Sequence, residues 1–178
     1  SIYNIPQFSL INKAWLDDLG LEVPTTLDEL HTALKAFKDN DMSHKYYGND
    51  AGTTLPMSTG FDQWCWGQNI FYAGFGFTNW PNDVCNDLVL QGDGTIKFMC
   101  VDDKYREAVT YFHDWYADGL MDVEMFSQSD TQLMSKCQQG WVGVSTWWYI
   151  DELMGDYAKD YVFLPVLSGP DGTKNVTV

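Results

Sequence analysis

The sequence predicts a helix-rich α/β fold with a small sheet, and the α+β class is the alternative. Segments with an apolar residue every three or four positions, which are typical of amphipathic helices, outnumber the short runs that favour strands. Capping residues and glycines mark where several of these helices begin and end. The chain has 178 residues, 45% of them hydrophobic, so it is long enough to bury one sizeable core. We therefore expect a single domain over residues 1–178.

The clearest predicted helix follows Pro24. Thr26 and Glu29 have the spacing of a capping box, in which each side chain satisfies a backbone amide at the start of a helix. Helical spacing then continues through four apolar residues: Leu27, Leu30, Leu34 and Phe37. Further helices are expected near residues 11–19, 60–73, 103–118 and 131–139, and Trp147-Trp148-Tyr149 is expected to open a short one.

Strands are expected where short apolar or alternating runs lie between turn residues. These runs cover residues 2–6, 141–144 and 161–164. A β-hairpin is expected over 87–99, where two strand-like runs flank Gly92-Asp93-Gly94. Residues 39–59 are rich in Asn, Asp, Gly and Ser, and they are predicted to form a long loop.

The acidic composition argues against two classes of partner. Ten basic and 25 acidic residues give a formal net charge of −15, whereas nucleic-acid binding needs a basic face. An anionic membrane surface is disfavoured for the same reason. No apolar run approaches the roughly 20 residues of a membrane-spanning helix. The chain begins at Ser1 with no signal peptide, which leaves a cytosolic protein or a trimmed part of a larger one.

The cysteines do not indicate a metal or redox centre. They form no CxxC pair, which disfavours a zinc ribbon or a thioredoxin-like site. Buried small hydrophobes are the preferred interpretation, and three disulfide pairings remain open. The four residues are Cys65, Cys85, Cys100 and Cys137.

No catalytic residue or cofactor is expected from the motifs. Gly143-Val144-Ser145-Thr146-Trp147 begins like the nucleophile elbow of hydrolases, but it ends in Trp where the tight turn needs Gly. Residues 74–79 begin like a dinucleotide-binding loop and lack its final Gly. Carboxylate pairs suited to glycoside hydrolysis cannot be selected from 25 acidic residues without their geometry.

No metal site is expected either. The three histidines, His31, His44 and His113, lack the spacing of metal ligands. Four residues match positions of a calcium-binding loop, but His44 occupies the position that requires Gly, so a solvated acidic loop is the better interpretation. These four are Asp39, Asp41, Ser43 and Asp50.

The aromatic residues suggest a ligand. They make up 16% of the chain and include eight tryptophans, and a flat aromatic face beside a carboxylate or amide suits a sugar ring. Asp62, Trp66 and Asn69 fall on one face of the expected 60–73 helix, and consecutive rings at 147–149 cannot all face one core. Packing in the core is favoured for Trp64, Trp115 and Trp141. The candidate ligand-binding residues are Asp62, Trp64, Trp66, Asn69, Trp147, Trp148 and Tyr149.

Several segments, in order, resemble the extracellular solute-binding proteins of family 1, which are carbohydrate-binding subunits of bacterial ABC importers. Residues 11–30, INKAWLDDLGLEVPTTLDEL, resemble the family's N-K-x-x-L-x-x-L-G-L-x-x-P-x-T-x-D-E-L segment. The end of the 105–122 segment, WYADGLMD, resembles its Y-x-x-G-L-i-D helix end. Weaker matches are GTIKF at 94–98, WVGV followed by Trp148, and Leu164-Pro165 with Gly169-Pro170-Asp171-Gly172.

The resemblance implies one lobe of a two-lobed clamshell of the type II periplasmic-binding class. This would be the C-terminal lobe, with the other lobe absent from the chain. It implies no catalysis, a carbohydrate ligand in the cleft between lobes, membrane permease subunits as partners, and a cell-surface lipoprotein of a Gram-positive bacterium whose lipid anchor lies on the missing part. It places Trp148 on the sugar and the 62–66 segment toward the cleft. Thr146-Trp147 stands where relatives often have Gly-Pro, which leaves open which ring faces the cleft.

Two alternative functions remain. One is a carbohydrate-active enzyme or a stand-alone sugar-binding module, which the resemblance does not require but the aromatic residues allow. The other is a peptide or amino-sugar binder on the same scaffold, which the negative charge would suit. The identity, length and linkage of a sugar are not encoded in any motif of the chain.

Overall fold

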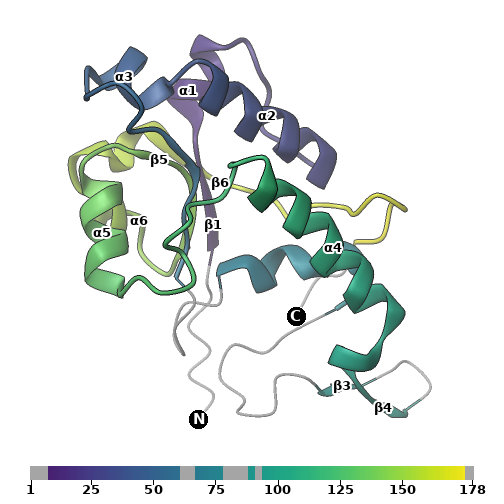
Figure 1. The fold of residues 1–178 in the computed structure, drawn as a ribbon. Coiled ribbons are helices and arrows are strands. Elements are labelled where there is room, and N and C mark those ends of the chain that lie inside the picture. Colours follow the sequence, from purple (N-terminus) through teal and green to yellow (C-terminus); the bar gives the residue numbers. More distant parts are fainter. Residues whose placement is uncertain (1–7, 61–66, 78–87, 91–93, 175–178) are drawn as a thin grey trace.

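A computed structural model of the chain describes residues 8–60, 67–77, 88–90 and 94–174 (Figure 1). Its centre is a four-stranded sheet in the order β2-β5-β1-β6. Strand β1 (Phe8–Asn12) runs antiparallel to β5 (Val142–Trp147) and to β6 (Tyr161–Phe163). The short edge strand β2 (Leu55–Met57) runs parallel to β5, with Met57 opposite Val144. Every residue of β5 is buried, as expected of a strand with a neighbour on each side.

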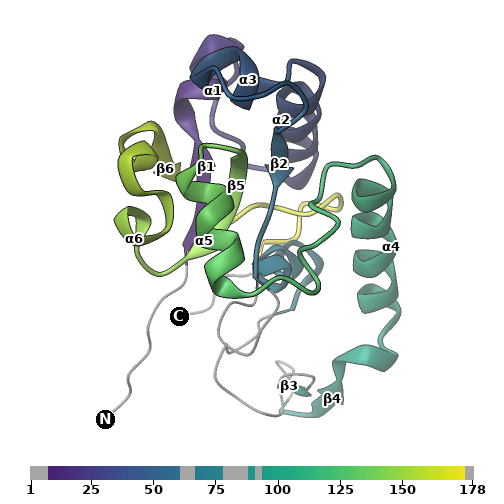
Figure 2. The ribbon, with the colours of Figure 1, turned by 60° about the vertical axis from the view of Figure 1, so that its left-hand side comes forward.

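Helices cover both faces of this sheet. They are α1 (Lys13–Asp18), α2 (Leu27–Asp39), α3 (Met42–Tyr47), α4 (Asp103–Ala117), α5 (Asp130–Gln138) and α6 (Ile150–Met154). Three 3₁₀ helices span Gly67–Phe75, Met99–Val101 and Gly155–Asp160, and the hairpin strands are β3 (Leu88–Leu90) and β4 (Ile96–Phe98). Figure 2 shows α5 and α6 on the side of the sheet away from α4.

The core has two parts because neighbouring residues of a strand point to opposite faces. Ile11 belongs to the larger cluster, which includes residues of α2, α4 and the Gly67–Phe75 helix. Leu10 belongs to a smaller cluster with Trp147 and residues of α5 and α6. The fold therefore has helical layers on both sides of the strands. None of the described helices is long and apolar enough to cross a membrane.

Most predicted elements are confirmed. The capping box at Thr26 and Glu29 is present, with Glu29 N donating to Thr26 Oγ1 at 3.1 Å. The helices expected at 103–118 and 131–139 and the strand at 161–164 agree with α4, α5 and β6 within two residues. The predicted hairpin pairs β3 with β4 in antiparallel register. The expected 2–6 strand lies outside the described residues.

Some predicted boundaries are wrong. Ile11 belongs to β1, so the first helix starts at Lys13. Residues 39–59 are not one loop, because they contain α3 and β2. Pro56 makes β2 difficult to predict from the sequence, because proline is disfavoured in a central strand. An edge strand such as β2 tolerates it. The strand expected at 141–144 extends to Trp147, so α6 opens only at Ile150. The described part of the expected 60–73 helix is the 3₁₀ helix Gly67–Phe75.

Burial separates the cysteines and tryptophans that were expected in the core. Cys137 and Trp115 are buried, and Trp141 is partly buried against the smaller cluster. Cys100 is exposed, so the expectation of a buried small hydrophobe is wrong there. Cys65, Cys85 and Trp64 lie outside the described residues.

Gly143 is the point of closest approach between β5, β2 and α2. A Cβ atom at this position would lie 2.6 Å from Phe37 Cδ2 and 2.7 Å from the Pro56 carbonyl oxygen. Both distances are far below van der Waals contact, and one of the two neighbours is backbone. The absence of a side chain at Gly143 thus allows α2 to pack directly on the pair of parallel strands.

Gly143→Ala is expected to lower the free energy of unfolding by about 1–3 kcal/mol, because the added methyl overpacks this contact. Urea denaturation followed by circular dichroism measures the change. An unchanged midpoint would mean that Phe37 and β2 move aside at no cost, and would contradict the tight packing described here.

Candidate functional site

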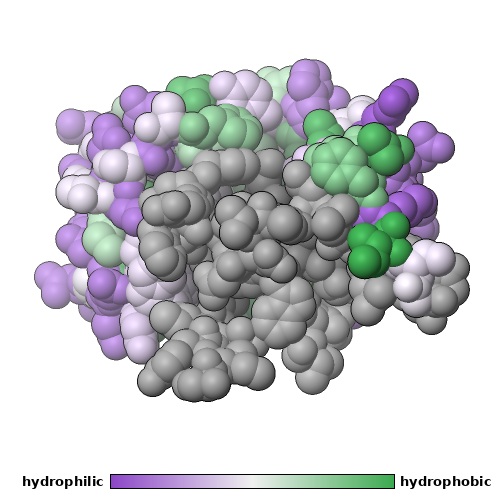
Figure 3. Space-filling view, turned by 90° about the horizontal axis from the view of Figure 1, so that it is seen from below, coloured by the Kyte–Doolittle hydropathy of each residue, from purple (hydrophilic) through white to green (hydrophobic). Residues whose placement is uncertain are grey.

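The sheet brings two of the predicted site segments to one edge. Strands β2 and β5 are parallel, so their carboxyl ends meet at the same side of the sheet, the lower side in Figure 1. Residues 58–60 leave β2 there and lead to Asp62, Trp64 and Trp66, which lie outside the described residues. Trp148 leaves β5 at the same edge. Figure 3 views the molecule from below, with green hydrophobic and purple hydrophilic residues around its rim.

The consecutive rings after β5 differ in exposure. Trp147 is 2% exposed and belongs to the smaller core cluster, whereas Trp148 is only partly buried and Tyr149 is 65% exposed. The two indoles are stacked, with ring centroids 4.4 Å apart and planes 28° apart. This arrangement favours Trp148 and Tyr149 over Trp147 as residues that a ligand reaches, and ligand binding by all three stays a prediction.

Glu152, in the first turn of α6, contacts both indoles. Its Oε2 atom accepts a hydrogen bond from Trp147 Nε1 at 2.9 Å and from Trp148 Nε1 at 3.1 Å. A buried indole N–H needs such an acceptor. Glu152 is not among the residues predicted from the sequence, although it follows the two tryptophans by five and four residues within the short helix expected there, which is a usable signal.

The grouping of Asp62, Trp66 and Asn69 on one helical face stays a prediction. Asn69 lies in the 3₁₀ helix Gly67–Phe75, and the other two residues are outside the described part of the chain. A 3₁₀ helix has three residues per turn, so the i, i+4, i+7 pattern of an α-helix does not carry through this segment.

An exposed ring pair near the same edge was also missed. Phe8 lies opposite Trp147 in the sheet register and is 37% exposed. Its ring centroid is 4.9 Å from that of Phe163 on β6, which is 56% exposed. The contact between Phe8 and Phe163 follows from the pairing of β1 with β6, and it cannot be predicted from the sequence because the two residues are far apart in the chain.

A buried polar network fixes the backbone where it leaves β2. Ser58 Oγ donates to Asp122 Oδ2 at 2.7 Å. Gln128 Nε2 donates to Ser58 Oγ at 3.0 Å and to the Thr59 carbonyl oxygen at 2.8 Å. Lys136 Nζ, from α5, donates to Asp122 Oδ2 at 2.6 Å. The network therefore holds the start of the predicted cleft segment against α5 and the 122–128 loop.

The charge at the centre of this network is well compensated. Burial by itself would lower the pKa of Lys136, but hydrogen bonds to Asp122 and Glu124 outweigh it and raise the pKa above the ordinary value of 10.5. The ammonium group is therefore charged at neutral pH. Its stabilising contribution is complete below pH 10.5 and is lost as the pH rises through the higher folded-state pKa.

Asp122→Ala is expected to lower the free energy of unfolding by at least about 2 kcal/mol, because it removes the buried carboxylate that accepts hydrogen bonds from both the Lys136 ammonium and the Ser58 hydroxyl. Glu124→Ala removes the other carboxylate that contacts Lys136, but that side chain is 61% exposed. It is expected to cost less than about 1 kcal/mol. Urea denaturation measures both variants. Equal losses in the free energy of unfolding would show that the buried carboxylate stabilises the fold no more than the exposed one.

Two of the four residues that match a calcium loop, Asp41 and Ser43, have side-chain partners within the protein. Asp41 Oδ2 accepts from Gly52 N and Oδ1 accepts from Thr54 Oγ1, both at 2.6 Å. Burial would raise the pKa of Asp41, but these hydrogen bonds outweigh it and lower the pKa. Ser43 Oγ accepts from the Asn49 amide at 2.8 Å. These hydrogen bonds engage Asp41 and Ser43 within the protein.

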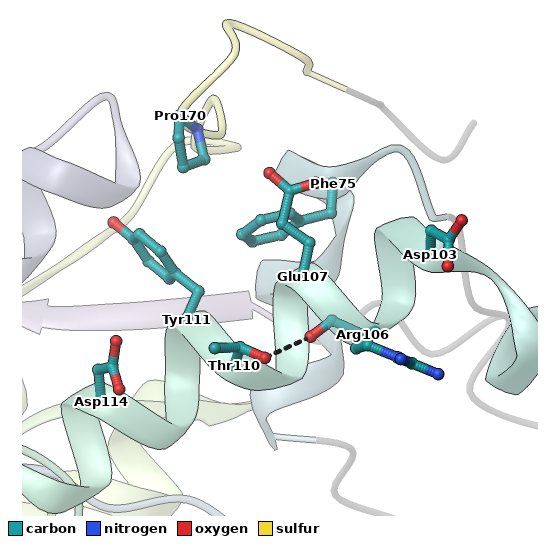
Figure 4. A pocket seen from close by; sticks show the side chains of 8 residues that line it. All are labelled: Phe75, Asp103, Arg106, Glu107, Thr110, Tyr111, Asp114 and Pro170. Carbon is teal, nitrogen blue, oxygen red and sulfur yellow. Dashed lines mark hydrogen bonds between the residues drawn. The ribbon is translucent and has the colours of Figure 1, made fainter.

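A hollow lies between α4 and the turn that contains Pro170, with a volume of about 530 Å³. Figure 4 shows Phe75, Glu107 and Tyr111 facing Pro170 across it, while Arg106 points away along the helix. The Tyr111 hydroxyl donates to Asp28 Oδ1 at 2.6 Å. Because the Tyr111 hydroxyl already has a hydrogen-bond partner within the protein, the hollow is a weaker candidate for sugar binding than the edge of the sheet beside Trp148.

The chain has relatives among characterised sugar-binding proteins. FusA of Streptococcus pneumoniae serotype 4, a fructooligosaccharide ABC transporter substrate-binding protein, is 33% identical over 176 residues, which are 99% of this chain and 31% of FusA. The solved structure of FusA in complex with kestose has a TM-score of 0.77 and 30% identity, over 96% of this chain and 33% of that one. The chain is a homologue of bacterial extracellular solute-binding proteins. Residues 1–178 span about a third of the length of these relatives.

Further comparisons agree with this homology to solute-binding proteins. YtcQ of Bacillus subtilis, a polygalacturonan/rhamnogalacturonan-binding protein, is 27% identical over 94% of this chain and 32% of its own length. An HMO-binding, ABC-transporter-associated solute-binding protein of Bifidobacterium longum infantis has a TM-score of 0.78 and 30% identity, over 94% of this chain and 35% of that one. No family model matches the chain. The helix-rich fold and the resemblance to solute-binding proteins are thus confirmed.

Proposed function

We propose that the chain is the C-terminal lobe of an extracellular binding protein that delivers an oligosaccharide to an ABC importer. The observation that carries this proposal is the homology over nearly the whole chain with FusA, whose solved structures contain kestose and fructo-nystose. The geometry supports it, because the partly exposed Trp148 lies at the edge where β2 and β5 end. The protein performs no chemistry in this proposal.

The sugar binds between this lobe and a second lobe that the chain does not contain. Closure of the two lobes shifts the population toward a form that the importer's membrane subunits recognise. Those permease subunits are the protein partners. LipO of Bacillus subtilis, a lipoprotein, matches 76% of this chain, which supports attachment to the cell surface through a lipid on another part of the intact protein.

The first test is a thermal-shift screen of the intact protein against kestose, nystose, stachyose and laminaribiose, with peptides and polyamines as controls. Ligand binding raises the unfolding temperature by mass action and assumes no reaction. We expect a shift with at least one neutral oligosaccharide. A shift with peptides or polyamines alone would reject the proposal, and so would cleavage of an oligosaccharide that a single carboxylate substitution abolishes.

Trp148→Ala in the intact protein is expected to weaken binding of the oligosaccharide found in that screen at least tenfold, which corresponds to about 1.4 kcal/mol. Trp141→Ala is the matched control, because this partly buried tryptophan lies at the opposite end of β5, seven residues or about 23 Å away at roughly 3.3 Å per residue. Isothermal titration calorimetry measures both. Retention of affinity within threefold in Trp148→Ala would contradict the assignment of this ring.

A further inference from the structure

We infer that Glu152 is a positioning residue that holds the stacked Trp148 ring in one orientation for its ligand. The inference deepens the proposed function and rests on it. The Glu152 carboxylate acts through the two tryptophans, because it accepts hydrogen bonds from both indole N–H groups.

Trp147 provides the fixed surface. Its ring is 2% exposed in the smaller core cluster, so it has little freedom to turn. Trp148 stacks on it at 4.4 Å. Stacking is weakly directional and would allow the second indole to shift through its side-chain torsions, whereas the hydrogen bond from Trp148 Nε1 to Glu152 adds a directional restraint on the edge of the ring.

The backbone of Glu152 is held independently of its side chain. Leu153 and Met154, the next residues of α6, are fully buried. The carbonyl oxygen of Glu152 accepts a hydrogen bond from Gln138 Nε2 of α5 at 3.0 Å. The carboxylate therefore approaches the indoles from an anchored helix, and one oxygen, Oε2, restrains both rings at once.

A ring that is already ordered loses less conformational freedom when a sugar stacks on it. Ordering a side chain on binding opposes affinity, and preorganisation removes that cost. Glu152 is itself exposed, so its side chain contributes little to the core. Loss of the Glu152 carboxylate should therefore weaken binding while leaving the fold in place.

Glu152→Ala, Glu152→Gln and Asp151→Ala in the intact protein form the test. The glutamine keeps a carbonyl oxygen that accepts from both indoles. Asp151 is the adjacent exposed acid of α6, so its removal matches the charge change without touching the rings. The first readout is the circular-dichroism couplet of the stacked indoles, defined as the part of the spectrum that Trp148→Ala removes. The second is affinity for kestose by calorimetry.

We expect Glu152→Ala to lose most of the couplet and about five- to tenfold in affinity. Glu152→Gln and Asp151→Ala should keep the couplet and stay within about threefold of the unmodified protein, a difference below about 0.7 kcal/mol. An unchanged couplet and affinity in Glu152→Ala would overturn the inference. An intact couplet with lost affinity in Glu152→Gln would also overturn it, since the carboxylate would then contact the sugar itself.

A failure of the proposed function gives a result that differs from a failure of the inference about Glu152. If kestose and the other oligosaccharides do not bind, that function is rejected. The couplet of Glu152→Ala then decides alone whether this carboxylate positions the Trp148 ring, because it needs no ligand.

Discussion

Because β2 and β5 run in the same direction, with Met57 opposite Val144, the segments that leave these strands emerge side by side. One segment leads toward Asp62 and Trp66, and the other carries Trp148. The other features of the candidate site depend on this pairing. The pairing in turn depends on Gly143, where the absence of a side chain lets Phe37 and the Pro56 carbonyl come close to β5.

A three-residue edge strand is a weak element by itself, and the surrounding polar network compensates for this. Ser58 and Thr59 continue β2, and both are held through Gln128, which connects them to the Asp122–Lys136 pair. Buried ion pairs contribute little net stability when compared with apolar packing, but their directional bonds specify one geometry. Here that geometry is the direction in which the chain leaves the sheet.

The aromatic residues separate into two groups by physical environment. Trp15, Trp115 and Trp147 are almost completely buried and fill the two parts of the core. Trp148 and Tyr149 remain accessible beside the end of β5. In the proposed function, such accessible rings suit the C–H face of a sugar, and the buried Trp147 provides the surface on which Trp148 stacks.

The sequence by itself determined the helix class, the capping box at Thr26, the main helices and the family resemblance, because these features depend on residues close together in the chain. It also identified the aromatic residues at 147–149 as a group that could not all face one core. Only the tertiary structure decided that β2 is a strand, that Trp147 is the buried ring, and that Glu152 joins both indoles. The reason is physical: β2 is stabilised by pairing with residues almost 90 positions away in the chain, and burial of one ring instead of its neighbour depends on which face of β5 the α5 and α6 helices cover.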